Sequence, residues 1–283
     1  MQDITKTEEL IRERRSCRTF GEKAIEPQKI KQLQDFIDEA NKNAKQMRFA
    51  LFALNAGGRI GTYGMISGGH TYIAGIIQKN REHIEELGME FEKIILFATS
   101  LGLGTCWLAG IDRKTFTGKI ELAENEVVAV ASPVGYAARP RIKESLARMV
   151  IGADKRKPWG ELFFLEEPGR VLPREKAGEM ARALEMARLA PSASNRQPWR
   201  VVLDGIKFHF CLARTPGYGA EQPFDIQKSD IGIAMCHFEL FAGEGQWVFF
   251  DTIRFKEPFV YIKTWEASLT AGHTESGESM QKD

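Results

Sequence analysis

Residues 190–200 carry side chains that could hold a planar polar ligand. They read Ala-Pro-Ser-Ala-Ser-Asn-Arg-Gln-Pro-Trp-Arg, with two hydroxyls and two amides between the prolines. Each amide offers donors and an acceptor, and each proline fixes the torsion φ, so the loop is partly ordered before it binds anything. Because serine, asparagine and proline are also common in turns, an ordinary helix-to-strand connection is the alternative interpretation.

A second polar run, residues 14–20, brings three arginines and two hydroxyls close together. It reads Arg-Arg-Ser-Cys-Arg-Thr-Phe and follows a predicted helix at 6–14, for which Thr5 is a suitable N-cap. Another helix is predicted at 27–40, because proline suits the first helical turn and apolar residues recur on one face. The polar run therefore lies in a connection between two helices.

The rest of the chain predicts helices and strands in a repeated order. Strands are expected at 47–54, 69–77 and 127–134, a Gly-rich loop at 59–67, and a long apolar helix at 85–101 that ends at Gly102. After a connector at 158–174, the order begins again with a helix at 175–189, strands at 201–204 and 206–213, a helix at 231–242 and strands at 246–250 and 259–263. The polar tail from 268 has no periodicity and is expected to be disordered.

The composition describes an ordinary globular protein with room for a large core. Of the 283 residues, 43% are hydrophobic and 27% are charged. Lys and Arg number 39 against 38 Asp and Glu, so the net charge of +1 predicts neither nucleic acid nor an anionic membrane as a partner. No apolar run approaches the roughly 20 residues that span a bilayer, and the N-terminus lacks a hydrophobic signal region. We therefore expect a cytoplasmic protein.

The cysteines and histidines have neither metal-binding nor disulfide spacing. Cys17, Cys106, Cys211 and Cys236 lie far apart and are expected to be reduced thiols, as in a cytosolic protein. The five histidines are scattered and form no zinc-binding pattern. No metal site is expected.

The two long apolar helices match each other without a gap at an offset of 144 residues. Glu86 corresponds to Asp230, Gly88 corresponds to Gly232, and both helices contain the run Leu-Phe-Ala toward their ends. The elements around them follow in the same order. This repetition predicts an internal duplication, with a first half at 1–165, a second half at 166–267 and a tail at 268–283.

The halves are unequal in a complementary way. The first half has the arginine run at 14–18, but its helix-to-strand loop has no prolines. The second half has the loop at 190–200, but only scattered arginines where an arginine run should precede it. If one site needs both parts, a single chain builds one site between its halves, as two subunits of a homodimer would.

These motifs resemble those of the FMN-dependent nitroreductase family. Residues 14–18 are similar to its N-terminal signature, residues 190–199 to its most specific motif, and residues 102–107 and 134–136 to its C-terminal half. Together they cover most of residues 10–250. The resemblance implies an α+β, nitroreductase-like fold with central β-sheets packed by helices, which the family builds as an intertwined homodimer with FMN at the interface. Here two pseudo-symmetric halves would mimic that homodimer in one chain, acting as a monomer.

The resemblance also implies a phosphate-binding group of residues. Planar guanidinium forks suit the phosphate dianion of FMN. Arg14, Ser16, Arg18 and Arg156 are expected around it, and Arg15 is included because it lies inside the motif. Taken singly, each arginine could equally be a solvated surface charge, and this alternative is strongest for Arg15.

Further residues are expected near the flavin ring and its ribityl chain. They are Ser192, Ser194, Asn195 and Gln197 from the second half, together with the backbone of Leu108, Ala109 and Gly110 near flavin N5, where small residues permit close approach. Trp107 and Trp199 are expected in the core, and Cys17 and Cys106 as packing residues. Arg196 is either a cation near flavin N1 or a surface residue.

The implied activity is that of an oxidoreductase with FMN and NAD(P)H as cofactors. It would take hydride from NAD(P)H and reduce a small-molecule electron acceptor, a nitroaromatic or a quinone, in a ping-pong cycle without a catalytic acid or base from the protein. One alternative is a reductive dehalogenase or flavin-fragmenting enzyme of the same fold, with residues 55–68 as a lid. The others are a flavin-binding or sensory protein without turnover, and a generic α+β domain without a cofactor.

Two features depart from the family pattern. The first apolar helix begins with Glu86-Leu87-Gly88 where the family has Asp-x-Gly, so the pocket wall there could differ. The loop at 59–67 matches no family segment.

Overall fold

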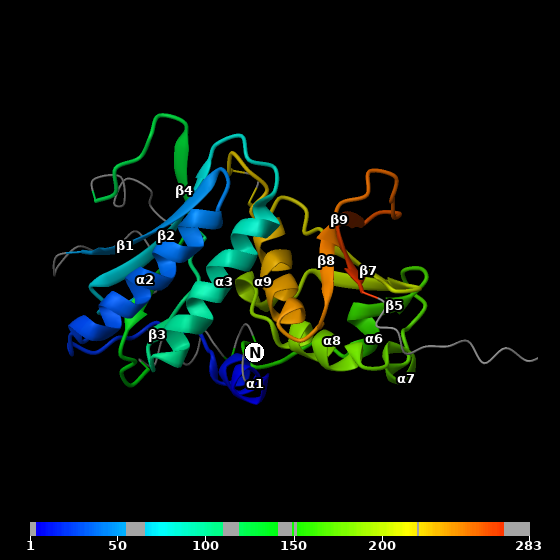
Figure 1. Ribbon diagram of the computed structural model, residues 1–283, viewed down its shortest axis with the longest axis horizontal. Coiled ribbons are helices and arrows are strands. Elements are labelled where there is room, and N and C mark those ends of the chain that lie inside the picture. Colours follow the sequence, from blue (N-terminus) through cyan, green and yellow to red (C-terminus); the bar gives the residue numbers. More distant parts are fainter. Residues whose placement is uncertain are drawn as a thin grey trace, which may run out of the picture.

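The computed structural model describes residues 4–54, 66–109, 119–140, 149, 152–219 and 221–268. A pair of helices, α3 (Ile84–Ser100) and α9 (Gln227–Glu239), lies at the centre, with one β-sheet on each side (Figure 1). Almost every side chain of α9 is buried, because this helix has protein on all sides. None of the described helices is long and apolar enough to cross a membrane.

The first half builds a four-stranded antiparallel sheet in the order β1-β2-β4-β3. Its elements are α1 (Ile4–Glu13), α2 (Pro27–Asn43), β1 (Met47–Ala53), β2 (Thr71–Gln78), α3, β3 (Gly104–Thr105) and β4 (Glu126–Gly135). The predicted helices and strands of this half are confirmed to within a few residues. The predicted loop at 59–67 lies mostly outside the described residues, as does most of the predicted lid at 55–68.

The second half builds a five-stranded sheet in the order β5-β6-β7-β9-β8. Its elements are α6 (Trp159–Leu162), β5 (Phe163–Leu165), α7 (Arg174–Ala177), α8 (Met180–Leu189), β6 (Trp199–Asp204), β7 (Lys207–Ala213), α9, β8 (Gly245–Val248) and β9 (Phe259–Ala267). All neighbouring strands are antiparallel except β5 and β6, which run parallel.

Strand order is the same in the two sheets once β5 is set aside. The order β1-β2-β4-β3 corresponds to β6-β7-β9-β8, and α3 and α9 follow the second strand in each half. Even the irregularity in strand register recurs, between Gly75 and Ile76 in β2 and between Phe210 and Cys211 in β7. This repeated topology supports the prediction of two pseudo-symmetric halves.

The halves are joined by segments that cross from one to the other. Strand β5 precedes the predicted boundary at residue 165, yet it pairs with the second sheet. Helix α1 packs against α3 and α8, and its Ile11 is buried in the hydrophobic cluster of the second half. The chain therefore forms an interlocked pair of halves.

Some predicted elements are wrong in detail. The connector at 158–174 contains α6 and β5, which its mixed composition did not reveal. The helix predicted at 175–189 is broken into α7 and α8 at Gly178, whose φ of 53° leaves the helical region. Helix α9 begins at Gln227 and ends at Glu239, so the predicted range of 231–242 is displaced toward the C-terminus. Residues 269–283 of the predicted tail lie outside the described residues.

Candidate functional site

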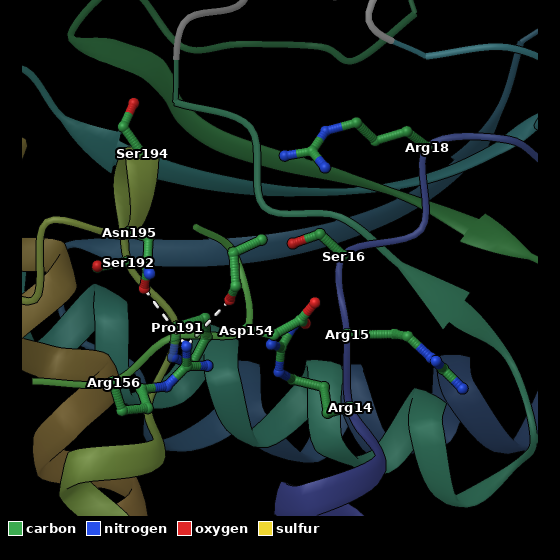
Figure 2. Close-up of a pocket in the computed structure, with 11 residues that line it drawn as sticks. Arg14, Arg15, Ser16, Arg18, Asp154, Arg156, Pro191, Ser192, Ser194 and Asn195 are labelled. Carbon is green, nitrogen blue, oxygen red and sulfur yellow. Dashed lines mark hydrogen bonds between the residues drawn. The ribbon is translucent and has the colours of Figure 1, made fainter. Parts of the chain in front are cut away.

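A pocket opens between the two halves, and three separate segments of the chain meet there (Figure 2). They are the segment after α1, the segment before α6 and the loop between α8 and β6. The lining residues are Arg14, Arg15, Ser16, Arg18, Ala153, Asp154, Arg156, Pro191, Ser192, Ser194 and Asn195. The structure thus brings together the arginine run of the first half and the polar loop of the second.

The arginine run is held as an extended segment beside the first sheet. Cys17 N donates to the carbonyl of Thr105 at 2.7 Å, and Ser67 N donates to the carbonyl of Arg18 at 2.8 Å. Cys17 and Cys106 are both buried, which confirms the prediction that they are packing residues. With the backbone anchored, alternate side chains of the run are directed to opposite sides.

The directions of the arginine side chains differ within the run. Arg18 extends across the opening toward the loop that carries Ser194, whereas the Arg15 side chain points the other way (Figure 2). Arg14 lies deeper, with a side chain only 6% exposed. Of the three arginines, Arg14 and Arg18 are therefore better directed to hold a ligand than Arg15.

The loop between α8 and β6 has an unusual backbone that its hydrogen bonds stabilise. Ser194, Asn195 and Gln197 have φ values of 50°, 54° and 50°, a region that non-glycine residues seldom occupy, at roughly 1–3 kcal/mol each. Gln197 N donates to the Ser192 hydroxyl at 2.8 Å. The backbone N–H of Ala193 donates to both carboxylate oxygens of Asp230, at 3.1 and 3.2 Å. These contacts hold the loop in one conformation, as expected for a preorganised site.

Asp230, at the start of α9, was not among the predicted site residues. Burial raises the pKa of Asp230 to about 7, although the hydrogen bond from Ala193 and the charge of Arg196 oppose the shift. Asp230 is the acid of the Asp-x-Gly run in α9, and it contacts the loop through Ala193. The equivalent position of the first helix is Glu86, which instead pairs with Arg81 and Lys263.

Arg156 is held by three backbone carbonyls, including that of Lys155 at 3.0 Å, and by the loop residue Asn195. Its Nη1 donates to Asn195 Oδ1 at 3.4 Å and to the carbonyl of Ala153 at 3.0 Å, and its Nε donates to the carbonyl of Leu189 at 3.2 Å. Asn195 Nδ2 donates in turn to the carbonyl of Gly152 at 2.6 Å. The amide of Asn195 therefore acts, together with these carbonyls, as a brace that holds a guanidinium at the pocket wall (Figure 2).

Three other predicted residues, Gln197, Leu108 and Ala109, are not among the described residues that line the pocket. Gln197 is 3% exposed, and its Oε1 accepts from the backbone N–H of Lys157 at 2.7 Å, so it ties the loop to the segment before α6. Leu108 is buried and paired with Ala131 through two backbone hydrogen bonds. Neither Leu108 nor Ala109 is among the lining residues. Gly110 lies outside the described residues.

The remaining aromatic and cationic predictions concern residues near the pocket. Trp199 is fully buried in the hydrophobic cluster of the second half, which confirms the prediction that it is a core residue. Trp107 packs against the hydrophobic clusters of both halves. Its Nε1 donates to Oε2 of Glu92 at 2.6 Å. Arg196 is exposed, with its guanidinium 4.8 Å from the ring centre of Tyr218.

The pocket concentrates positive charge. Its described lining residues include four arginines and a single carboxylate, that of Asp154. Burial lowers the pKa of the Arg156 guanidinium, and the positive charges of Arg14 and Arg188 lower it further. A bound dianion would relieve this repulsion, because guanidinium groups donate paired hydrogen bonds to phosphate oxygens. The donor set thus fits a phosphate group, with Ser16, Ser192 and Asn195 as further polar groups.

The pseudo-symmetric position in the other half has a different character. A second pocket there includes Lys45 and Met47, from the loop that corresponds to the loop at 190–200. No arginine is among its described lining residues, and three glutamates are. In this second pocket Lys93 forms ion pairs with Glu90 and Glu239, so these charges neutralise one another. Among the described lining residues, the first pocket therefore gathers arginines and the second does not.

Comparisons with known proteins agree with this fold. A family model described as "Putative TM nitroreductase" matches residues 6–242. A solved structure of a "putative nitroreductase" from Thermotoga maritima MSB8 is 22% identical, covers 92% of this chain and 93% of its own, and has a TM-score of 0.56. None of the curated proteins compared with the chain matches it.

Other solved structures match about half of the chain. A nitroreductase family protein from Clostridium difficile 630 is 19% identical over 57% of this chain and 96% of its own, with a TM-score of 0.42. A nitroreductase with bound FMN from Desulfitobacterium hafniense DCB-2 is 18% identical over 50% and 93%, with a TM-score of 0.40. With a family match that spans most of its length and a fold of the same kind, this chain belongs to the nitroreductase family.

Proposed function

We propose that the chain is an FMN-dependent oxidoreductase with one flavin site, formed between its two halves. The observation that carries this proposal is the pocket in which arginines of the first half face the Ser192–Asn195 loop of the second. A phosphate group is the ligand that best fits several guanidinium groups on ordered backbone. Membership of the nitroreductase family makes FMN the natural bearer of that phosphate.

The roles of the residues follow from their positions. Arg14, Arg18 and Arg156 would bind the phosphate, with Asn195 holding Arg156 in place. The hydroxyls of Ser16, Ser192 and Ser194 would donate to the phosphate or the ribityl chain. The bound FMN would supply the redox chemistry, accepting hydride from NADH or NADPH and passing electrons to a nitroaromatic or quinone-like acceptor. We assign no catalytic acid or base to the protein.

The same proposal covers the assembly of the protein and its surroundings. The repeated strand order supports a single chain that acts as a pseudo-dimer, with halves at 1–165 and 166–267. The second equivalent pocket has no arginine among its described lining residues, so the expected stoichiometry is one FMN per chain. Such an enzyme needs no partner protein, and we expect it to act as a cytoplasmic monomer.

The visible spectrum of the purified protein tests the proposal. The protein is titrated with FMN and then mixed anaerobically with NADH or NADPH. One bound flavin per chain that bleaches on mixing supports the reductase. A flavin that binds and stays oxidised would instead favour a binding or sensory protein, and no bound flavin would refute the proposal.

A further inference from the structure

A buried carboxylate lies directly behind the arginines of the pocket. Glu92, on α3, is completely buried, and its Oε2 accepts from Trp107 Nε1 at 2.6 Å. Its Oε1 lies 3.0 Å from His237 Nε2, on α9, and 3.9 Å from Nε of Arg14. The carboxylate therefore links both central helices to an arginine of the proposed phosphate site.

The hydrogen-bond partners of His237 indicate where a proton lies. Its Nδ1 is 3.2 Å from the carbonyl oxygen of Met186, which can only accept, so Nδ1 carries a hydrogen. Its Nε2 faces an oxygen of Glu92, and a bare nitrogen there would meet a bare carboxylate oxygen. The contact requires a proton between the two, carried either by the imidazole or by the carboxyl group. In both cases the pair of Glu92 and His237 has no net charge.

Lys93, the lysine next to the pair in sequence, does not take over this role. Lys93 follows Glu92 in sequence, but its Nζ lies 2.8 Å from Glu90 and 3.4 Å from Glu239. A buried carboxylate is stable only when it is paired and hydrogen-bonded. Without the proton of the pair, Glu92 would draw on the nearby guanidinium of Arg14 as its counter-charge.

We infer that His237 neutralises Glu92 and thereby keeps the charge of Arg14 available to the phosphate of the flavin. His237 is thus a positioning residue, which acts on the ligand through Glu92 and Arg14. The inference rests on the proposed function, since the phosphate is that of FMN. Both halves line the pocket, and this contact behind it also needs both of them. Glu92 belongs to the first half and His237 to the second.

The test compares the affinities of FMN and riboflavin, which lacks the phosphate, in a set of variants. His237→Gln removes the imidazole that shares a proton with Glu92, so Glu92 should turn to Arg14 for its counter-charge. We expect FMN to bind about tenfold more weakly and riboflavin to bind as before. In Glu92→Gln, the amide can donate to His237 and accept from Trp107, so FMN should bind no more weakly than in the wild type. The double variant Glu92→Gln/His237→Gln should regain most of the FMN affinity that His237→Gln loses.

A matched control is His209→Gln. His209 is also a buried histidine, 6% exposed, but it bonds to Thr264 within the second sheet. This substitution should leave the affinities of both flavins unchanged. Dissociation constants follow from the quenching of flavin fluorescence, and thermal unfolding shows that each variant is folded.

Each other outcome has a definite meaning. Equal weakening of FMN and riboflavin in His237→Gln, or no recovery in the double variant, would overturn the inference while leaving the proposed function intact. If His237→Gln does not fold, Glu92→Gln decides, because a selective loss of FMN binding there would show that the carboxylate supports Arg14. A wild-type chain that binds neither flavin would refute the proposed function and the inference with it.

Discussion

Gly88 of α3 and Gly232 of α9 face each other where the two central helices cross. A β-carbon added to Gly232 would lie 1.9 Å from the carbonyl oxygen of Glu85 and 2.9 Å from the α-carbon of Gly88. A β-carbon added to Gly88 would lie 2.3 Å from the carbonyl oxygen of Ser229. These are the residues that align at an offset of 144. The matching glycines therefore mark the point about which the two halves are joined.

Gly232→Ala should destabilise the fold, although alanine is the better helix former by about 1 kcal/mol. The added methyl group forces α3 and α9 apart, and overpacking of this kind costs roughly 1–3 kcal/mol or more. Urea unfolding measures the change. Gly21→Ala is the control, because its nearest neighbour would be 3.8 Å away, and its free energy of unfolding should change by less than about 0.5 kcal/mol. Equal stabilities of the two variants would contradict the close helix contact.

Arg14→Ala and Asn195→Ala should each weaken the binding of the same single FMN. The first removes a guanidinium, and the second removes the brace of Arg156. Loss of one charged hydrogen-bonding group corresponds to about 10- to 100-fold in the dissociation constant. Arg15→Ala, whose side chain points away from the others in Figure 2, should have a smaller effect. Fluorescence titration gives affinity and stoichiometry, and two flavins per chain would refute the account of complementary halves.

Asp230→Asn should change how stability depends on pH. Burial raises the pKa of Asp230 to about 7 in the folded chain, above its ordinary value of 3.8. The folded state then binds more protons than the unfolded state between these values, so Asp230 reduces stability as the pH rises from about 4 to 7. Above pH 7 the variant should be more stable than the wild type, by an amount on the order of 2–4 kcal/mol at most.

The control for this prediction lies within the same experiment. Below about pH 4 the carboxyl group is protonated in both states, so the two proteins should differ little. Asparagine keeps an oxygen that can accept from the N–H of Ala193. Unfolding free energies measured from pH 4 to pH 8 provide the comparison, and a difference that does not grow with pH would contradict the predicted protonation.

The four cysteines should be unreactive in the native protein. All four are buried and none forms a disulfide. Burial raises the pKa of Cys211 and of Cys236, which suppresses the reactive thiolate further. Ellman's reagent should label no thiol rapidly until denaturant is added, when all four should react. Rapid labelling of a thiol in the folded protein would contradict this prediction. It would show that Cys17 or Cys106, the two cysteines of the first half, is accessible to the reagent.

Much of the local structure could be predicted from the sequence. Pro27 starts α2 as predicted, and continuous apolar runs identified α3 and β4. The two motifs that line the pocket were also recognisable, because each is a short run whose residue types already indicate its chemistry. Glu92 was missed, because it is one of several charged residues in α3 and nothing in the sequence sets it apart from Glu90 or Lys93.

Local patterns determined the elements and the chemical groups available to this protein, since helix periodicity, caps and motif residues depend on near neighbours. Only the tertiary structure decided which groups meet: Arg14 with Glu92, Glu92 with His237, and β5 with the second sheet. It also directed Gln197 inward and Arg18 across the pocket. The physical reason is that these contacts join residues far apart in the chain, and the close packing of α3 on α9 sets their distances.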